Sequence, residues 1–152
     1  MSAERFTLDT NILVYAIDAR EGAKRGLAQD IVAAAARLNC PLALQAIGEF
    51  HVASATKLKL GAKDAAVRAR QLMAGFETFG HSASAFRAAF DEVPKGRFSF
   101  WDSVLLASAA EAGCTVILSE DMADGSRFGS IAVLNPFGPD ALTPGANALL
   151  GY

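Results

Sequence analysis

The sequence has little of what marks several common protein classes. Its 152 residues include two cysteines, Cys40 and Cys114, and neither stands in a CxxC or Cys/His arrangement, which argues against a zinc site or a disulfide framework. No apolar run approaches the ~20 residues of a membrane helix, and no basic segment followed by an apolar stretch opens the chain. We therefore expect a soluble, cytoplasmic protein with no membrane partner. The net charge of −2 is not that of a general nucleic-acid coat protein.

Several catalytic motifs are also missing. There is no G-x-S-x-G elbow, no Walker A lysine loop and no G-x-G-x-x-G after the first predicted strand, so the sequence does not favour a hydrolase triad, nucleotide triphosphate use or dinucleotide binding. Of the two histidines, His51 faces away from Glu49 on a predicted helix, and His81 has no acid or hydroxyl partner placed by the sequence. A histidine-pair ribonuclease mechanism is therefore disfavoured.

What the sequence does contain is a set of four carboxylates at the edge of apolar runs or inside them. They are Asp9, Glu49, Asp102 and Asp121. Burying an unpaired carboxylate costs several kcal/mol unless a cation, a hydrogen-bond network or a metal compensates, and few cations lie close to these four in sequence. A divalent metal is the economical explanation, and a metal held by acids indicates phosphate chemistry.

Helices and strands alternate along the chain. Apolar runs predict strands at residues 5–8, 41–44, 115–118 and 131–134, with a short edge strand at 77–79. Helical spacing predicts helices at residues 12–17, 21–38, 45 onward, 65–76, 82–90 and 104–110, the last capped by Ser99. This alternation predicts one α/β domain over residues 1–137, with a mostly parallel sheet of about five strands covered on both faces. Residues 138–152, rich in Gly, Pro and Ala, are expected to form a C-terminal tail that is either loosely packed or docked late in folding.

The predicted strands place the acids at one edge of the sheet. Ligand sites in such sheets lie beyond the carboxyl ends of the strands. Asp9 follows the first strand, Glu49 the second and Asp121 the strand at 115–118, while Asp102 would enter from the side. Each has a simpler explanation, since Asp9 and Asp102 could be helix caps and Glu49 an exposed helical residue. Independent caps would have no reason to share one sheet edge, so we favour a common site.

Two assignments stay open at this level. Glu120 lies beside Asp121, so the fourth acid could be displaced by one residue, and Asp124 could contribute through a water molecule. A group of basic residues follows the helix that carries Glu49. Its members are Lys57, Lys59, Lys63, Arg68 and Arg70. Phosphate binding by this group is the less favoured hypothesis until geometry supports it, because a solvated helix face explains the same charges.

The flanking residues of the four acids form an ordered set of motifs. In chain order these are Leu8-Asp9-Thr10-Asn11-Ile12-Leu13, then Glu49, then Trp101-Asp102, then Leu118-Ser119-Glu120-Asp121-Met122 with Gly125, and Leu134-Asn135-Pro136-Phe137. This order resembles the PIN domain, and specifically VapC-type toxins of bacterial toxin–antitoxin pairs. The resemblance spans residues 4–137, which is nearly the whole chain.

The resemblance implies a fold, an activity and partners. The fold would be a three-layer α/β/α sandwich, and the activity that of an endoribonuclease using one or two Mg²⁺ or Mn²⁺ ions and leaving a 3′-hydroxyl and a 5′-phosphate. The matching catalytic and metal-binding residues are Asp9, Glu49, Asp102 and Asp121, supported by Thr10, Asn11 and Ser119. The implied partners are RNA, a second copy in a homodimer, and a VapB-type antitoxin whose C-terminal segment lies over the active site.

Two other functions compete with this one. A small-molecule phosphatase could use Asp9 as a nucleophile, but that chemistry usually needs a second Asp two residues on, where this chain has Asn11. A non-catalytic interaction module could keep the PIN fold with its acids acting as helix caps. Binding of manganese through the carboxylates would separate that module from an enzyme.

Overall fold

The order of the first elements brings Asp9 to the end of a buried strand. The computed structural model describes residues 4–152, and it begins with β1 (Phe6–Leu8), all three residues of which are buried. The next element, α1 (Thr10–Tyr15), starts directly after Asp9, because the Asp9 side chain caps it by accepting a hydrogen bond from the Thr10 amide. Asp9 therefore occupies a strand-to-helix corner.

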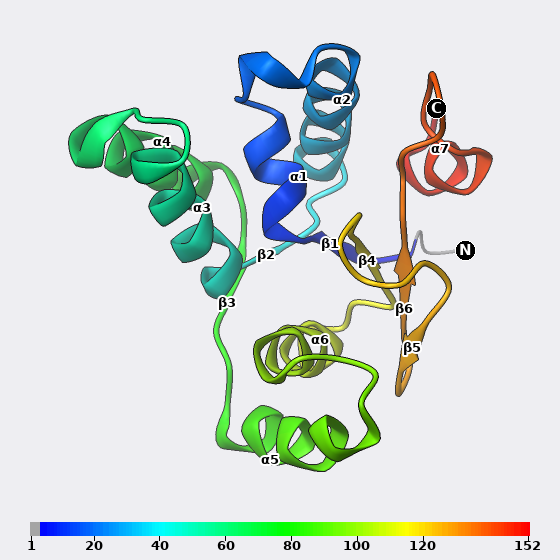
Figure 1. The fold of residues 1–152 in the computed structure, drawn as a ribbon. Helices are drawn as coiled ribbons and strands as arrows, with labels where there is room; N and C mark the ends of the chain where they lie inside the picture. The colour runs from blue at the N-terminus through cyan, green and yellow to red at the C-terminus, as the bar shows by residue number, and fades with distance from the viewer. Residues whose placement is uncertain (1–3) are drawn as a thin grey trace.

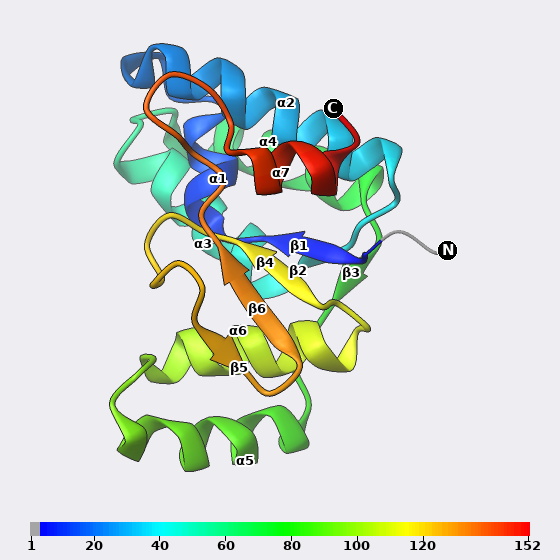
Figure 2. The same cartoon turned by 90° about the vertical axis from the view of Figure 1, so that its right-hand side faces the viewer.

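A mostly parallel sheet forms the middle layer. Its strand order is β1-β4-β6-β5, in which β4 (Val116–Leu118) pairs in parallel with both β1 and β6 (Ile131–Leu134), and β5 (Arg127–Phe128) is an antiparallel edge. A second parallel pair, β2 (Leu42–Ala43) and β3 (Thr78–Phe79), lies beside β1 (Figure 2). There the Thr7 hydroxyl donates to the Pro41 carbonyl at 2.7 Å in place of a backbone ladder. The predicted mostly parallel sheet is confirmed.

Helices cover both faces of the sheet, which confirms the three-layer α/β/α arrangement (Figure 1). On one face lie α1, α2 (Ala23–Arg37) and α7 (Pro144–Leu150), and on the other lie α5 (Ala83–Glu92) and α6 (Phe100–Glu111). The pair α3 (Leu44–Thr56) and α4 (Gly61–Gly75) packs against α1 beyond β2 and β3. Single 3₁₀ turns, η1 (Ala19–Glu21) and η2 (Val93–Lys95), precede α2 and follow α5. No helix among residues 4–152 is long and apolar enough to cross a membrane.

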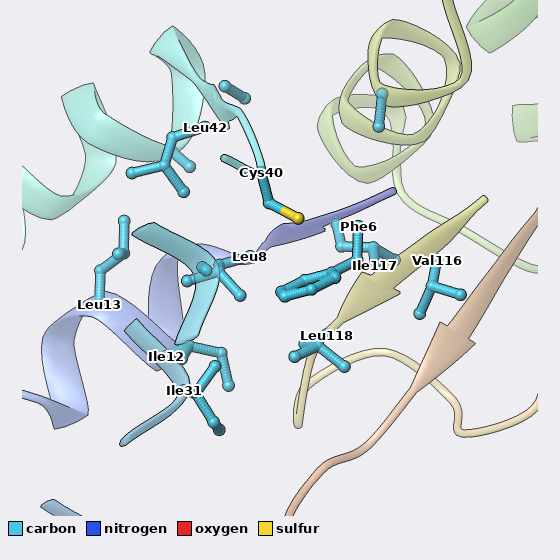
Figure 3. Close-up of a cluster of buried hydrophobic side chains, with 14 of the residues drawn as sticks. Phe6, Leu8, Ile12, Leu13, Ile31, Cys40, Leu42, Val116, Ile117 and Leu118 are labelled. Carbon is cyan, nitrogen blue, oxygen red and sulfur yellow. The ribbon is translucent and has the colours of Figure 1, made fainter. Parts of the chain in front are cut away.

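The hydrophobic core lies on both faces of the sheet, because its buried residues include Ile12 and Ile31 of α1 and α2 and also Leu105 and Leu106 of α6. Phe6 and Leu8 of β1 share one face of the sheet with Leu118 of β4, and Ile12 and Ile31 from the two helices belong to the same cluster (Figure 3). The neighbouring Ile117 points to the opposite face. Full burial of six such side chains stabilises the fold by about 1.5 to 3 kcal/mol for each of them. Both cysteines are free and buried here, as the sequence predicts.

The C-terminal residues pack differently from the prediction. Of the two alternatives for residues 138–152, loose packing is wrong, because α7 lies against α2 with Ala146 and Leu150 fully buried. Thr143 caps α7 and Pro144 begins it, which are ordinary helix-start residues. The Tyr152 hydroxyl also donates to the Asp30 carbonyl on α2 at 2.9 Å. This segment therefore forms part of the helical layer.

Candidate active site

A pocket opens where the sequence analysis expects one, at the carboxyl ends of β1 and β4. Its volume is about 430 Å³, and we call it the acid pocket. Its lining residues are Asp9, Thr10, Asn11, Val14, Tyr15, Glu49, Ala53, Lys57, Asp102 and Asp121. All four predicted acids line this single pocket, although they lie up to 112 residues apart in the sequence, as the numbering shows.

Asp9 is the buried member of the set, with 6% of its surface exposed. Its Oδ1 accepts the Thr10 amide at 2.8 Å, and its Oδ2 accepts the Ser119 hydroxyl at 2.7 Å and the Asn11 amide nitrogen at 3.2 Å. These three donors are electrically neutral. They fix the orientation of the carboxylate without cancelling its charge, and all three come from the predicted supporting residues Thr10, Asn11 and Ser119.

Glu49 stands on the exposed side of α3 and is tied to two different elements. Its Oε2 accepts the Thr10 hydroxyl of α1 at 2.8 Å, and its Oε1 accepts Gln45 Nε2 at 3.3 Å. The same Gln45 nitrogen donates to the Trp101 carbonyl at 3.0 Å, one residue before Asp102. Gln45 thus connects the start of α3 to the start of α6, and it was not singled out from the sequence.

Asp102 lies in the first turn of α6, where the predicted capping signal is confirmed. The Ser99 hydroxyl accepts the Asp102 amide at 3.2 Å, so the helix start fixes the position of this acid. Burial raises the pKa of Asp102, the Ser99 hydrogen bond lowers it in part, and the charges of Glu49 and Asp121 raise it further. Asp102 therefore responds to the other acids as well as acting in the cap.

The three acids that competed for the fourth position have different partners. Asp121 lines the acid pocket. Glu120 accepts the Tyr15 hydroxyl at 2.8 Å and pairs with Lys24 Nζ at 2.9 Å, so its charge is compensated. Asp124 accepts the Asn135 amide at 2.8 Å and holds the loop before β5. This geometry supports Asp121 as the pocket acid and gives Glu120 and Asp124 structural contacts.

Two further polar side chains, Tyr15 and Lys57, line the pocket although the sequence did not assign them to it. Lys57 could have been recognised, because Glu49, Ala53 and Lys57 follow at four-residue spacing and so share one face of α3. Tyr15 offered no such signal, since its partner Glu120 is 105 residues away. His51 and His81 do not line the pocket.

Negative charge is concentrated in the acid pocket, because four acids line it. Burial raises the pKa of Asp9 to about 6, the hydrogen bonds from Ser119 and Thr10 offset part of that rise, and the charges of Asp102 and Asp121 add to it. Each ionised acid makes ionisation of the next less favourable. A cation placed among them would relieve both burial and repulsion.

The acids fit a hydrated divalent ion better than a closed metal cage. Among residues 4–152, no three acid, histidine or cysteine side chains lie close enough together to hold an ion by themselves. Mg²⁺ keeps several waters and is usually bound by one or two carboxylates and by substrate phosphates. Buried Asp9, with three more acids around the same pocket, provides such a set of oxygen ligands.

Solved structures with the same fold come from toxin–antitoxin systems. A Mycobacterium tuberculosis VapC20 structure, described as a sarcin-ricin loop cleaving toxin, is 18% identical with a TM-score of 0.59, over 76% of this chain and 91% of that chain. A toxin–antitoxin complex from Klebsiella pneumoniae is 18% identical with a TM-score of 0.59, over 86% and 97%. VapBC2 from Rickettsia felis, bound to a promoter DNA fragment, is 13% identical with a TM-score of 0.61, over 84% and 96%. At these identities the likeness establishes the fold.

Sequence comparison identifies the family directly. Comparison with curated proteins gives no significant match. The family model of the PIN domain matches residues 6–123, which include all four acids of the pocket. This match covers well over half of the chain and agrees with the resemblance drawn from the motifs. The chain belongs to the PIN domain family.

Proposed function

We propose that this chain is a metal-dependent endoribonuclease and acts as the toxin of a type II toxin–antitoxin system. The observation that carries the proposal is the acid pocket, in which Asp9, Glu49, Asp102 and Asp121 converge from four separate elements. PIN-domain membership and the likeness to the M. tuberculosis VapC20 structure, described as a sarcin-ricin loop cleaving toxin, support the same activity.

The four acids would hold one or two Mg²⁺ or Mn²⁺ ions. When bound, such an ion lowers the pKa of a coordinated water and offsets the charge of the attacked phosphate. The chain's own contribution is positional: Ser119, Asn11 and the Thr10 amide fix the Asp9 carboxylate, while the Thr10 hydroxyl fixes Glu49. In-line attack by water forms the new P–O bond and breaks the bond to the 3′ oxygen, which takes up a proton. The products are a 3′-hydroxyl and a 5′-phosphate.

The test is cleavage of transfer RNA and ribosomal RNA with and without Mn²⁺. Wild type should cleave in the presence of the metal, and Asp102→Ala should not. Asp124→Asn is the matched control, since it removes an acid close in sequence that holds the loop before β5 instead of lining the pocket. Equal activity in wild type and Asp102→Ala would contradict the assignment of Asp102 to the site.

The partners and location follow from the same proposal. We propose that a VapB-type antitoxin covers the acid pocket and that the chain forms a homodimer, because relatives of this fold are described as toxin–antitoxin and VapBC complexes. An RNA substrate places the activity in the cytoplasm. Light scattering on the purified chain tests the dimer, and inhibition of RNA cleavage by the co-expressed antitoxin tests the second partner.

A non-catalytic interaction module with the same fold is the second candidate. The observation that favours it is that no three acids within residues 4–152 stand close enough to hold an ion without help from water or phosphate. Calorimetric titration with Mn²⁺ separates the two candidates, because the module should show no carboxylate-dependent binding. The phosphatase alternative loses support, since the Asn11 side-chain amide donates a hydrogen bond to Asp9. A carboxamide does not act as a general acid or base, which that mechanism needs at this position.

A further inference from the structure

A second pocket lies beside the acid pocket and shares one residue with it. Its volume is also about 430 Å³, and its lining residues are Ile17, Asp18, Ala19, Arg20, Lys57, Leu58, Lys59 and Leu60. We call it the basic pocket. Lys57 lines both pockets, so the two hollows meet at this side chain.

The charges of the basic pocket are unequally compensated. Arg20 makes two hydrogen bonds to the buried Asp18 carboxylate, each of 2.9 Å, so these two charges offset each other. Lys57 and Lys59 are exposed and form no hydrogen bond or ion pair through their side chains with any other residue between 4 and 152. The basic pocket thus presents two lysine charges that form no ion pair within residues 4–152, next to the four acids of the acid pocket.

The segment that carries the two lysines is held in place by α3. The amides of Lys57 and Leu58 both donate to the Ala53 carbonyl, at 2.9 and 3.1 Å. The Leu60 amide donates to the Ser54 carbonyl at 3.1 Å. Within this turn Lys59 has a positive φ of 57°, a left-handed conformation that a residue with a side chain adopts only at a cost. Glycine would fit this backbone more easily, which suggests that the lysine side chain serves a purpose other than stability.

We propose that Lys57 and Lys59 bind the RNA phosphates that flank the one being cleaved, so that the basic pocket receives the substrate strand. This inference rests on the proposed ribonuclease function. A chain with a net charge of −2 and an acidic reaction site has no general attraction for a polyanion, and the attraction must come from local cations. Lys57 meets this need at the boundary of the acid pocket, and Lys59 extends it along the next phosphates.

The test compares RNA binding by three lysine variants at several salt concentrations. Anisotropy of a labelled single-stranded RNA in the presence of Mn²⁺ is measured in an Asp9→Asn background, so that the strand stays intact. Lys57→Ala and Lys59→Gly should each weaken binding about fivefold and reduce the slope of log K against log salt by about 0.7. Lys63→Ala, which removes an exposed lysine of α4 outside both pockets, should leave the slope unchanged.

Two additional readouts separate a phosphate contact from a structural role. In the chain with Asp9 intact, Lys57→Ala should raise KM for RNA cleavage and change kcat little, because the contact is made equally before and during reaction. Lys59→Gly should melt at the same temperature as wild type or higher, since it relieves the left-handed backbone while removing the charge.

The possible failures of this inference and of the ribonuclease proposal are distinct. The inference is overturned if the slope of log K against log salt is the same in Lys57→Ala, Lys59→Gly and Lys63→Ala. It is also overturned if RNA binding does not depend on salt. Either result counts against the inference even if wild type cleaves RNA. Lysine-dependent binding without cleavage would support the inference and count against the nuclease. Unchanged RNA binding together with weaker binding of an acidic antitoxin would assign the two lysines to a protein partner and overturn the inference.

Discussion

Two buried carboxylates in this protein have opposite kinds of partners. Asp9 is 6% exposed and Glu92, at the end of α5, is 4% exposed. Glu92 pairs with the cations Arg97 and Lys95, whereas Asp9 has three neutral donors. Burial raises the pKa of both, but at Glu92 the two cations outweigh it and the pKa lies below its usual value, while the pKa of Asp9 rises to about 6.

The difference separates an acid that serves the fold from one that serves a site. A buried carboxylate with its own cations contributes to stability and has little need for another charge. A carboxylate that is oriented by amides and hydroxyls remains short of positive charge and favours a cation from outside. The same contrast holds beside the acid pocket, where Glu120 has Lys24 and Asp121 lines the pocket. Partner type therefore distinguishes the two roles better than burial.

The largest expected effect is loss of RNA cleavage in Asp9→Asn. Asparagine keeps the shape and the helix cap but removes the negative charge that would hold the metal, so the rate should fall by about a thousandfold or more. Glu92→Gln is the matched variant, and it should cleave at the wild-type rate because Glu92 does not line the acid pocket. Rates with Mn²⁺ on the same RNA provide the measurement. Comparable losses in both variants would remove the distinction between the two acids.

A smaller effect is expected from Ser119→Ala, which removes one donor from Asp9. Ser119 is fully buried, and its hydroxyl donates to Asp9 at 2.7 Å while it accepts the Met122 amide at 3.2 Å. Loss of a residue that orients a metal ligand typically weakens metal affinity by about 10- to 100-fold. The Mn²⁺ concentration that gives half-maximal cleavage should rise accordingly. Thermal melting is measured alongside, because the unpaired Met122 amide will also lower stability.

The third prediction is that Asp9→Asn raises the free energy of unfolding in the absence of metal. Because the pKa of folded Asp9 is about 6, against 3.8 for the ordinary group, the unfolded chain releases this proton first as pH rises. Asp9 therefore lowers the free energy of unfolding progressively between these values, by on the order of 3 kcal/mol above pH 6. In metal-free buffer Asp9→Asn should unfold at higher denaturant than wild type at pH 7, and at nearly the same denaturant at pH 4.

Adding Mn²⁺ provides the control for that gain. A metal that binds the folded state stabilises it, so wild type should become more stable with Mn²⁺ while Asp9→Asn changes little. If Asp9→Asn proves less stable than wild type in metal-free buffer at pH 7, the carboxylate is contributing to the fold and the contrast with Glu92 is wrong.

The acid pocket could be predicted from the sequence because the position of each acid follows from the strand or helix next to it in the chain. Each acid follows a strand or starts a helix, and parallel strands bring their carboxyl ends to one edge. The choice between Asp121 and Glu120 was beyond sequence reasoning, because it depends on Lys24, a partner 96 residues away. Long-range pairing of this kind leaves no periodic signal in the chain.

The C-terminal segment shows a different limit. Its content of Gly, Pro and Ala favoured loose packing, yet Leu142, Ala146 and Leu150 recur at four-residue spacing and are all buried. Composition averages over all residues of the segment, whereas three regularly spaced apolar side chains were enough to pack it against the rest of the fold. Strand β5 was missed because two residues are too few to show alternation.

The smallest expected effect comes from Arg97→Met, which removes one cation from Glu92 and keeps an apolar stem near the Phe98 ring. Arg97 is half exposed, so water partly screens the pair and the loss in free energy of unfolding should be about 1 kcal/mol at pH 7. The cations hold the pKa of folded Glu92 below 4.5, so their contribution is present above that pH and disappears as pH falls. Denaturant curves for wild type and variant should therefore converge below about pH 4, opposite to the pH dependence expected at Asp9. A gap of equal size at pH 3 and pH 7 would attribute the effect to packing on Phe98.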